Sequence, residues 1–235
     1  MKKILLTILV ASLLIFGLLL AACDSSSSSG GVIGSNNLKL SISANTQELI
    51  ETSPGDFVQN DFTGNVDFNY IAGMRPYYFE IDDYINGSPT AEIKNGKLTI
   101  NFEEVNEDVL GIVDDTMLTW WYFGPTVAVT GGNEKILTLV GLSEKDDGTG
   151  NHLIQLKEMK PSSLKYILYV YVSGPVTMKG IHLTGGSFPT TWDCDFSTGW
   201  NTVLASFGES DVSFVTGKPG NDYKWTVMPF HPHDY

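Results

Sequence analysis

The sequence predicts an all-β protein, an antiparallel β-sandwich of the jelly-roll or immunoglobulin-like kind with few short helices. Three observations predict this class. Apolar and polar residues alternate with period two in many short segments, Gly, Pro, Asn and Asp separate these segments, and helical patterning is scarce. Many short strands with regular turn signals are typical of sandwiches.

The clearest local prediction is a hairpin around Asn95-Gly96. Residues 91–94 precede this pair, and apolar and polar side chains alternate over residues 98–102. Both central positions of a type I′ turn need positive φ, which Asn and Gly adopt most easily. The two segments should therefore pair as antiparallel neighbours.

The other predicted strands follow the same alternation. In chain order they cover residues 38–42, 66–71, 77–81, 117–123, 135–142, 152–156, 165–172, 176–183, 191–196, 200–206 and 223–228. Two segments, 46–51 and 107–113, have the composition of a helical turn or two.

Two predicted strands carry aromatic residues on both faces. In 165–172, both faces are apolar, which predicts a covered central strand. The alternative is an open second face on which Tyr169 and Tyr171 form an aromatic platform. The second strand is 117–123, in which Trp120 and Trp121 are successive residues and should face opposite sides of the sheet. They predict either two-sided burial or one exposed face that binds a sugar or a protein partner.

The chain begins with a leader typical of exported proteins. Two lysines precede an apolar run that ends in Leu20-Ala21-Ala22-Cys23. A basic start, an apolar stretch and small residues before a cleavage site predict a signal peptide over residues 1–22. An uncleaved membrane helix is one alternative, because about 20 apolar residues span a bilayer, and a plain cleaved signal peptide is the other.

This tetrapeptide resembles the lipobox of bacterial lipoproteins. The resemblance implies that Leu20, Ala21 and Ala22 are recognition positions and that Cys23 is acylated and becomes the new N-terminus. Asp24 and a Ser/Gly run follow, a composition that behaves as a flexible tether. Two or three acyl chains would hold the protein stably on a membrane.

The predicted organisation is a signal peptide, a lipidated linker over residues 23–37 and one β-sandwich domain over residues 38–235. The alternative is two β lobes that divide near residues 131–133. About 200 residues suffice for one domain with a sizeable core.

The charge excludes one class of partner. The formal net charge is −13, and the leader contains two of the basic residues, so the mature chain is more acidic still. Such a surface repels phosphate backbones, so nucleic acid is not an expected partner. The expected partners are the membrane, through lipid, and a glycan or protein ligand.

No motif predicts a catalytic residue, a cofactor or a strong metal site. Asp146-Asp147 in a Gly-rich loop and the terminal His231 and His233 are weak metal candidates, and a polar loop and a solvated tail are the alternatives. Cys194 lies on the apolar face of the strand 191–196, which predicts a core thiol.

A second, looser resemblance covers about a quarter of the chain. It rests on Tyr-Val-Tyr-Val at 169–172, Pro-Val-Thr-x-x-Gly at 175–180, Asp-Cys-Asp-Phe at 193–196 and Gly-Trp-Asn at 199–201. These motifs resemble small lipoproteins of spirochaetes and other host-associated bacteria. The resemblance implies a location and a β fold, but no mechanism.

The sequence therefore predicts a non-enzymatic, lipid-anchored protein of the cell envelope. Its place is the outer membrane or cell surface, or the periplasmic face of the inner membrane. Its expected role is binding or structural. A carbohydrate-binding module or adhesin is the first alternative, and an envelope glycoside hydrolase is the second.

Overall fold

The computed structural model describes ten stretches of the chain. They are residues 32–33, 38–53, 56–73, 78–112, 127–131, 133–145, 152–160, 165–182, 189–208 and 210–229. The strands are β1 (Val32–Ile33), β2 (Leu40–Ser53), β3 (Asp56–Asp61), β4 (Val66–Asp67), β5 (Tyr70–Ala72), β6 (Tyr78–Glu80), β7 (Ile85–Asn86), β8 (Thr90–Lys94), β9 (Lys97–Phe102), β10 (Glu104–Val105), β11 (Gly111–Ile112), β12 (Val127–Thr130), β13 (Lys135–Leu139), β14 (Gly141–Lys145), β15 (His152–Lys160), β16 (Lys165–Val172), β17 (Val176–His182), β18 (Thr190–Phe196), β19 (Gly199–Phe207), β20 (Val212–Thr216) and β21 (Lys224–Pro229). The helical elements are α2 (Ile81–Tyr84) and the single 3-10 turn η1 (Glu107–Val109).

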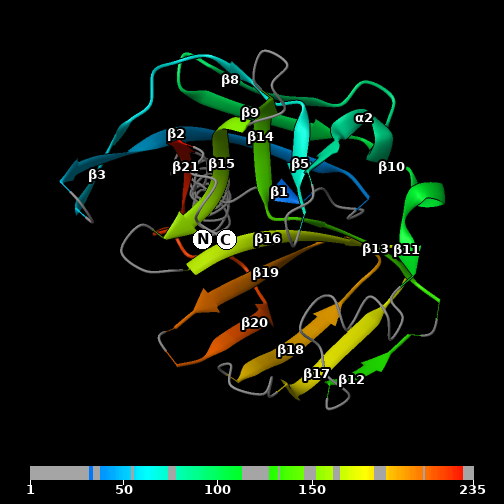
Figure 1. The fold of residues 1–235 in the computed structure, drawn as a ribbon. Coiled ribbons are helices and arrows are strands. Elements are labelled where there is room, and N and C mark those ends of the chain that lie inside the picture. Colours follow the sequence, from blue (N-terminus) through cyan, green and yellow to red (C-terminus); the bar gives the residue numbers. More distant parts are fainter. Residues whose placement is uncertain are drawn as a thin grey trace, which may run out of the picture.

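The upper layer in Figure 1 is an antiparallel sheet built on the first half of β2. In this sheet β1 and β9 flank β2, β8 pairs with β9, and β4 pairs with β8 at the far edge. The second half of β2 leaves the sheet and pairs with β3 on one side and with β21 on the other. One long strand therefore belongs to two hydrogen-bonded systems.

A wall of strands connects the upper layer with the central layer (Figure 1). From β2 the pairing runs through β21 and β15 to β14, β5 and β6. The end of β15 also pairs with the start of β16, which enters the central layer. In that layer β16 lies between β13 and β19, and β20 follows β19.

The lower layer continues from β20. Parallel pairing joins β20 to β18, and antiparallel pairing then joins β18 to β17 and β17 to β12. The strands curve back so that β12, β17 and β18 lie opposite β13, β16 and β19 (Figure 1).

Two hydrophobic cores lie on opposite faces of the central layer, and β16 supplies both. Ile167, Tyr169 and Tyr171 belong to the upper core, which also contains side chains of β2, β8 and β9. Leu168, Val170 and Val172 belong to the lower core, with side chains of β17 and β18. Burying each such side chain contributes roughly 1.5–3 kcal/mol, so this strand stabilises both halves of the molecule.

The all-β class with few helices is confirmed, and so is the hairpin at Asn95-Gly96. Asn95 has φ 49° and Gly96 has φ 74°, as a type I′ turn requires. The helical expectation for residues 46–51 is wrong, because β3 and β21 pair with this segment and tertiary pairing overrides local propensity. Of residues 107–113, only 107–109 form a turn of 3-10 helix.

Several predictions lie outside the described residues. These are the signal peptide and its recognition residues Leu20, Ala21 and Ala22, the lipidated Cys23, the strand with Trp120 and Trp121, and the metal candidates Asp146, Asp147, His231 and His233. In the part of the chain that is described, no helix has both the length and the apolar character needed to cross a membrane.

Candidate functional site

A polar hollow lies where the edge of the upper sheet meets the end of β14. Its volume is about 420 Å³, and it is lined by Asn65, Val66, Asp67, Ile93, Lys94, Asn95 and Glu144. These residues come from β4, the β8–β9 hairpin and β14, which are far apart in the sequence. The fold alone brings them together.

The predicted hairpin turn forms one wall of this hollow. The backbone N–H of Asn95 donates to Oδ1 of Asn65 at 2.7 Å. The N–H of Gly96 donates to the carbonyl of Gly64 at 3.2 Å, and the hydroxyl of Thr46 donates to the carbonyl of Gly96 at 2.8 Å. Contacts from two other segments therefore fix the turn, and the wall is preorganised.

Two buried apolar residues border the hollow. Val66 and Ile93 are cross-strand partners between β4 and β8, and both belong to the upper core. Their burial fixes the backbone that carries the polar residues of the hollow.

Asp67, which lines the hollow, has an acidic neighbour on the adjacent strand. Asp67 and Glu92 are directly opposite in the β4–β8 pairing, an arrangement that like charges disfavour. The ammonium of Lys94 lies 2.5 Å from the Glu92 carboxylate. This hydrogen bond, with further help from Asp67, raises the pKa of Lys94, which therefore stays charged.

Glu144 completes the polar lining from the opposite side. Partial burial, and secondarily the charge of Asp67, raises the pKa of Glu144. The pairing of β14 with β15 shifts register between Glu144 and Lys145. Such bulges re-aim a side chain, and they are enriched beside functional sites.

The hollow thus offers carboxylate acceptors, an ammonium and amide groups. This set can hydrogen-bond a ligand that carries several hydroxyls, because each hydroxyl both donates and accepts. Among the residues that the structure describes, no group of three or more His, Cys, Asp or Glu side chains is arranged to hold a metal ion.

The structure buries both tyrosines of the predicted platform. Tyr169 is 1% exposed and Tyr171 is 5% exposed, because the upper core covers this face of β16. Tyr169 stacks on Trp225, and Tyr171 packs edge-on against Trp200. The central-strand interpretation of 165–172 is therefore confirmed, and the platform alternative is wrong for these two residues.

Cys194 is a core residue, as its alternation predicts. It is fully buried in the lower core, and its thiol donates to the carbonyl of Phe214 at 3.4 Å. Burial raises the pKa of this thiol to about 12. A protonated, inaccessible thiol is not a nucleophile.

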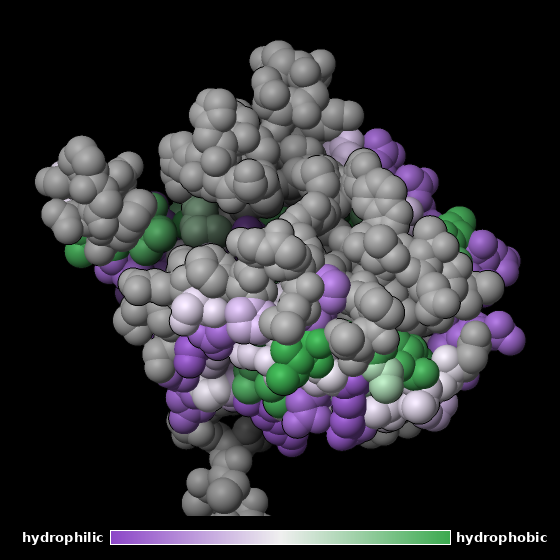
Figure 2. Space-filling view, turned by 60° about the horizontal axis from the view of Figure 1, so that its bottom comes forward, coloured by the Kyte–Doolittle hydropathy of each residue, from purple (hydrophilic) through white to green (hydrophobic). Residues whose placement is uncertain are grey.

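Where Figure 2 draws described residues in colour, polar and apolar groups stand side by side on the lower face. On the outer side of β17 and β18, Lys179 lies 3.2 Å from the Asp193 carboxylate and 2.8 Å from that of Asp195. Single exposed apolar residues such as Ile181 are ordinary on a protein surface.

Sequence patterns did not single out Asn65, Asp67, Lys94 or Glu144. The one signal beside them was Asn95-Gly96, which predicts the turn but not the segment against which it lies. Comparison with known protein families, curated proteins and solved structures finds no match for this chain.

Proposed function

We propose that this chain is a lipid-anchored protein of the cell envelope that acts by binding a small, hydroxyl-rich ligand such as a short saccharide. The hollow bounded by Asp67, Lys94 and Glu144 carries the binding part of the proposal. The leader, the Leu-Ala-Ala-Cys motif and the Ser/Gly run support the anchor.

The lining residues favour recognition through hydrogen bonds. Two carboxylates, an ammonium and amide groups are among the residues that line it. A saccharide presents many hydroxyls, and each hydroxyl can donate to a carboxylate or an amide oxygen and accept from an ammonium or an amide N–H. Charge-assisted hydrogen bonds to Asp67 and Glu144 would contribute most of the selectivity.

Calorimetric titration of the purified chain with glucose, galactose, N-acetylglucosamine and their disaccharides tests the binding. We expect at least one of these sugars to bind, and Asp67→Asn and Glu144→Gln each to weaken it about tenfold or more, since each removes a charged acceptor. Glu103→Gln is the control, because this exposed carboxylate does not line the hollow and lies 3.5 Å from the ammonium of Lys39. Affinity that is unchanged in both hollow variants would contradict the assignment.

A glycoside hydrolase is the second candidate, and one observation favours it. Partial burial, and secondarily the charge of Asp67, raises the pKa of Glu144, and glycoside hydrolases pair two carboxyl groups of which one has a raised pKa. Release of nitrophenol from p-nitrophenyl glycosides separates the two functions. Turnover that both Asp67→Asn and Glu144→Gln abolish would replace binding by hydrolysis.

The anchor is tested independently of the hollow. Cells that express the chain and grow with an alkyne analogue of palmitate should label it, and Cys23→Ala should abolish the label. A wild-type chain that stays unlabelled at full precursor mass would disprove the anchor and leave the binding proposal intact.

A further inference from the structure

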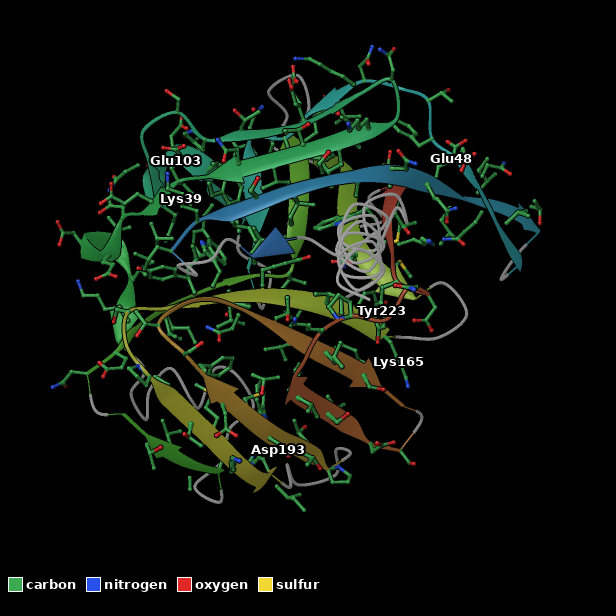
Figure 3. The ribbon with its side chains drawn as sticks, turned by 180° about the vertical axis from the view of Figure 1, so that it is seen from behind. Lys39, Glu48, Glu103, Lys165, Asp193 and Tyr223 are labelled. Carbon is green, nitrogen blue, oxygen red and sulfur yellow. The ribbon has the colours of Figure 1, made fainter. Side chains whose placement is uncertain are left out.

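The outer half of β2 and the whole of β3 form a two-stranded arm that extends away from the rest of the fold (Figure 1). The same arm projects on the opposite side of the view in Figure 3, where Glu48 marks its base. Pairing with β9 ends at Asn45, and pairing with β21 ends at Glu48. From Leu49 onward, β2 pairs in the described structure only with β3.

One face of this arm exposes an apolar pair. Ile50 and Val58 are directly opposite each other, with exposed fractions of 39% and 45%. Glu48 and Asn60 form the next cross-strand pair on the same face. Two adjacent β-branched side chains on a projecting hairpin are an apolar surface that a partner can cover.

The opposite face carries amides whose hydrogen bonds are incomplete. The register places Gln47, Leu49 and Gln59 on this face. Within the described part of the chain, Oε1 of Gln47 and Nε2 of Gln59 are buried and have no hydrogen-bond partner. The face that is open to a partner is therefore the one with Ile50 and Val58.

The outer edge of β3 is the third feature. Among the described strands, β3 pairs only with β2. An unpaired edge presents backbone donors and acceptors to any extended segment, and a two-stranded hairpin alone is marginally stable. A third strand along this edge would stabilise the arm.

The charge of the arm selects the partner. Residues 46–61 include Glu48, Glu51, Asp56 and Asp61 and no basic residue. A second copy of the chain would bring two such acidic segments together, in a molecule whose net charge is −13. A segment with lysine or arginine complements the arm instead.

We propose that the β2–β3 arm is a docking element that accepts, by strand addition along β3, an extended segment of a partner protein in which basic and apolar side chains alternate. Main-chain hydrogen bonds to the edge supply affinity in this mode, and alternate side chains supply selectivity. The apolar positions of the segment cover Ile50 and Val58, and its basic positions meet the acidic groups. This site is separate from the hollow.

The test uses the full chain in detergent and two capped heptapeptides, one alternating Lys and Val and one alternating Glu and Val. Fluorescence anisotropy should show saturable binding of the Lys-Val peptide that weakens with added salt, and none of the Glu-Val peptide. The double variant Ile50→Ser/Val58→Ser should lose about tenfold or more in affinity, because the apolar contact disappears. The matched control is Ile181→Ser, an exposed apolar residue on β17, which should bind like the wild type.

A second variant distinguishes loss of binding from loss of folding. Edge strands tolerate lysine, so Val58→Lys should melt at the same temperature as the wild type. The new positive charge repels the Lys-Val peptide, so binding of this peptide should weaken. The proposal is overturned if the wild type binds neither peptide, if it binds both equally, or if the arm variants bind like the wild type. It is also overturned if sedimentation shows a dimer that Ile50→Ser/Val58→Ser dissociates, because the surface would then belong to a second copy.

Discussion

Glu158 is a carboxyl group placed inside the upper core by the pairing of β15 with β21. It is 1% exposed and lies directly opposite Trp225. The hydroxyl of Tyr169 donates to its Oε2 at 2.5 Å, and within the described residues its Oε1 has no hydrogen-bond partner. Burial outweighs the hydrogen bond and raises the pKa of Glu158 to about 7.

This pKa predicts a stability that falls as pH rises. The unfolded chain releases the proton near the ordinary pKa of 4.5, whereas the folded chain holds it up to about 7. The folded state binds more protons in this window, so the stability contribution is complete below 4.5 and is lost by about pH 7. The loss should be roughly 3 kcal/mol.

The variant Glu158→Gln tests this prediction, because the amide is neutral at every pH and keeps the shape. Urea unfolding between pH 4.5 and 8 should show a weaker pH dependence than in the wild type, with the variant the more stable above pH 7. Glu103→Gln, at an exposed ion pair, should leave the profile unchanged. Equal slopes for wild type and Glu158→Gln would refute the assignment.

The Asn95-Gly96 turn shows why an element predicted from the sequence can also be critical in three dimensions. Gly96 has φ 74°, and a Cβ atom added there would lie 2.0 Å from the carbonyl oxygen of Phe62. Neither the conformation nor the space admits a side chain. The turn also forms the wall of the hollow through Asn95.

Gly96→Ala should therefore destabilise the fold by about 2–4 kcal/mol, because backbone strain and a clash with backbone act together. Gly87→Ala is the matched control. Gly87 has a similar positive φ of 88°, but nothing lies within 4 Å of its added Cβ. Its cost should be the strain alone, about 1 kcal/mol. If thermal melts give the two variants equal stability, the contact with Phe62 has no energetic role.

The period-two pattern predicted most elements because each strand buries one face or both. Residues 165–172 match β16, and 176–183 match β17 to within a residue. The pattern failed where other forces decide. Residues 46–51 have helical composition, yet β3 and β21 pair with them, and the predicted strand 135–142 divides into β13 and β14.

The candidate site could not be predicted from the sequence, for a related reason. Asp67, Lys94 and Glu144 each lie in an ordinary polar position of a strand, and no local motif joins them. Their proximity depends on β4 pairing with β8 and on β14 ending near that edge. Pairing between distant strands is decided by the packing of the whole molecule, which single-chain periodicity does not encode.

At the scale of the whole molecule, the central layer joins two cores into one structure. Ile167 and Leu168 are neighbours in β16, yet they pack in the upper and the lower core respectively. The layer also supplies Leu137 and Leu139 to the upper core and Ile136 to the lower. Neither core can lose this layer and stay covered, so the cores should unfold together.

Paired truncations test this coupling. Ile167→Ala removes methyl groups from the upper core and Val170→Ala from the lower core, at positions that are each 1% exposed. Each should lower the free energy of unfolding by about 2–4 kcal/mol. Each should also lower the midpoint of one common unfolding transition, because both cores pack on the same strand. Calorimetry of residues 23–235 should show a single peak whose calorimetric and van't Hoff enthalpies agree. Ile181→Ala, at a position 53% exposed, should change the melting temperature little. Two resolved peaks, with Ile167→Ala moving only one and Val170→Ala only the other, would instead mean that each half unfolds on its own despite sharing β16.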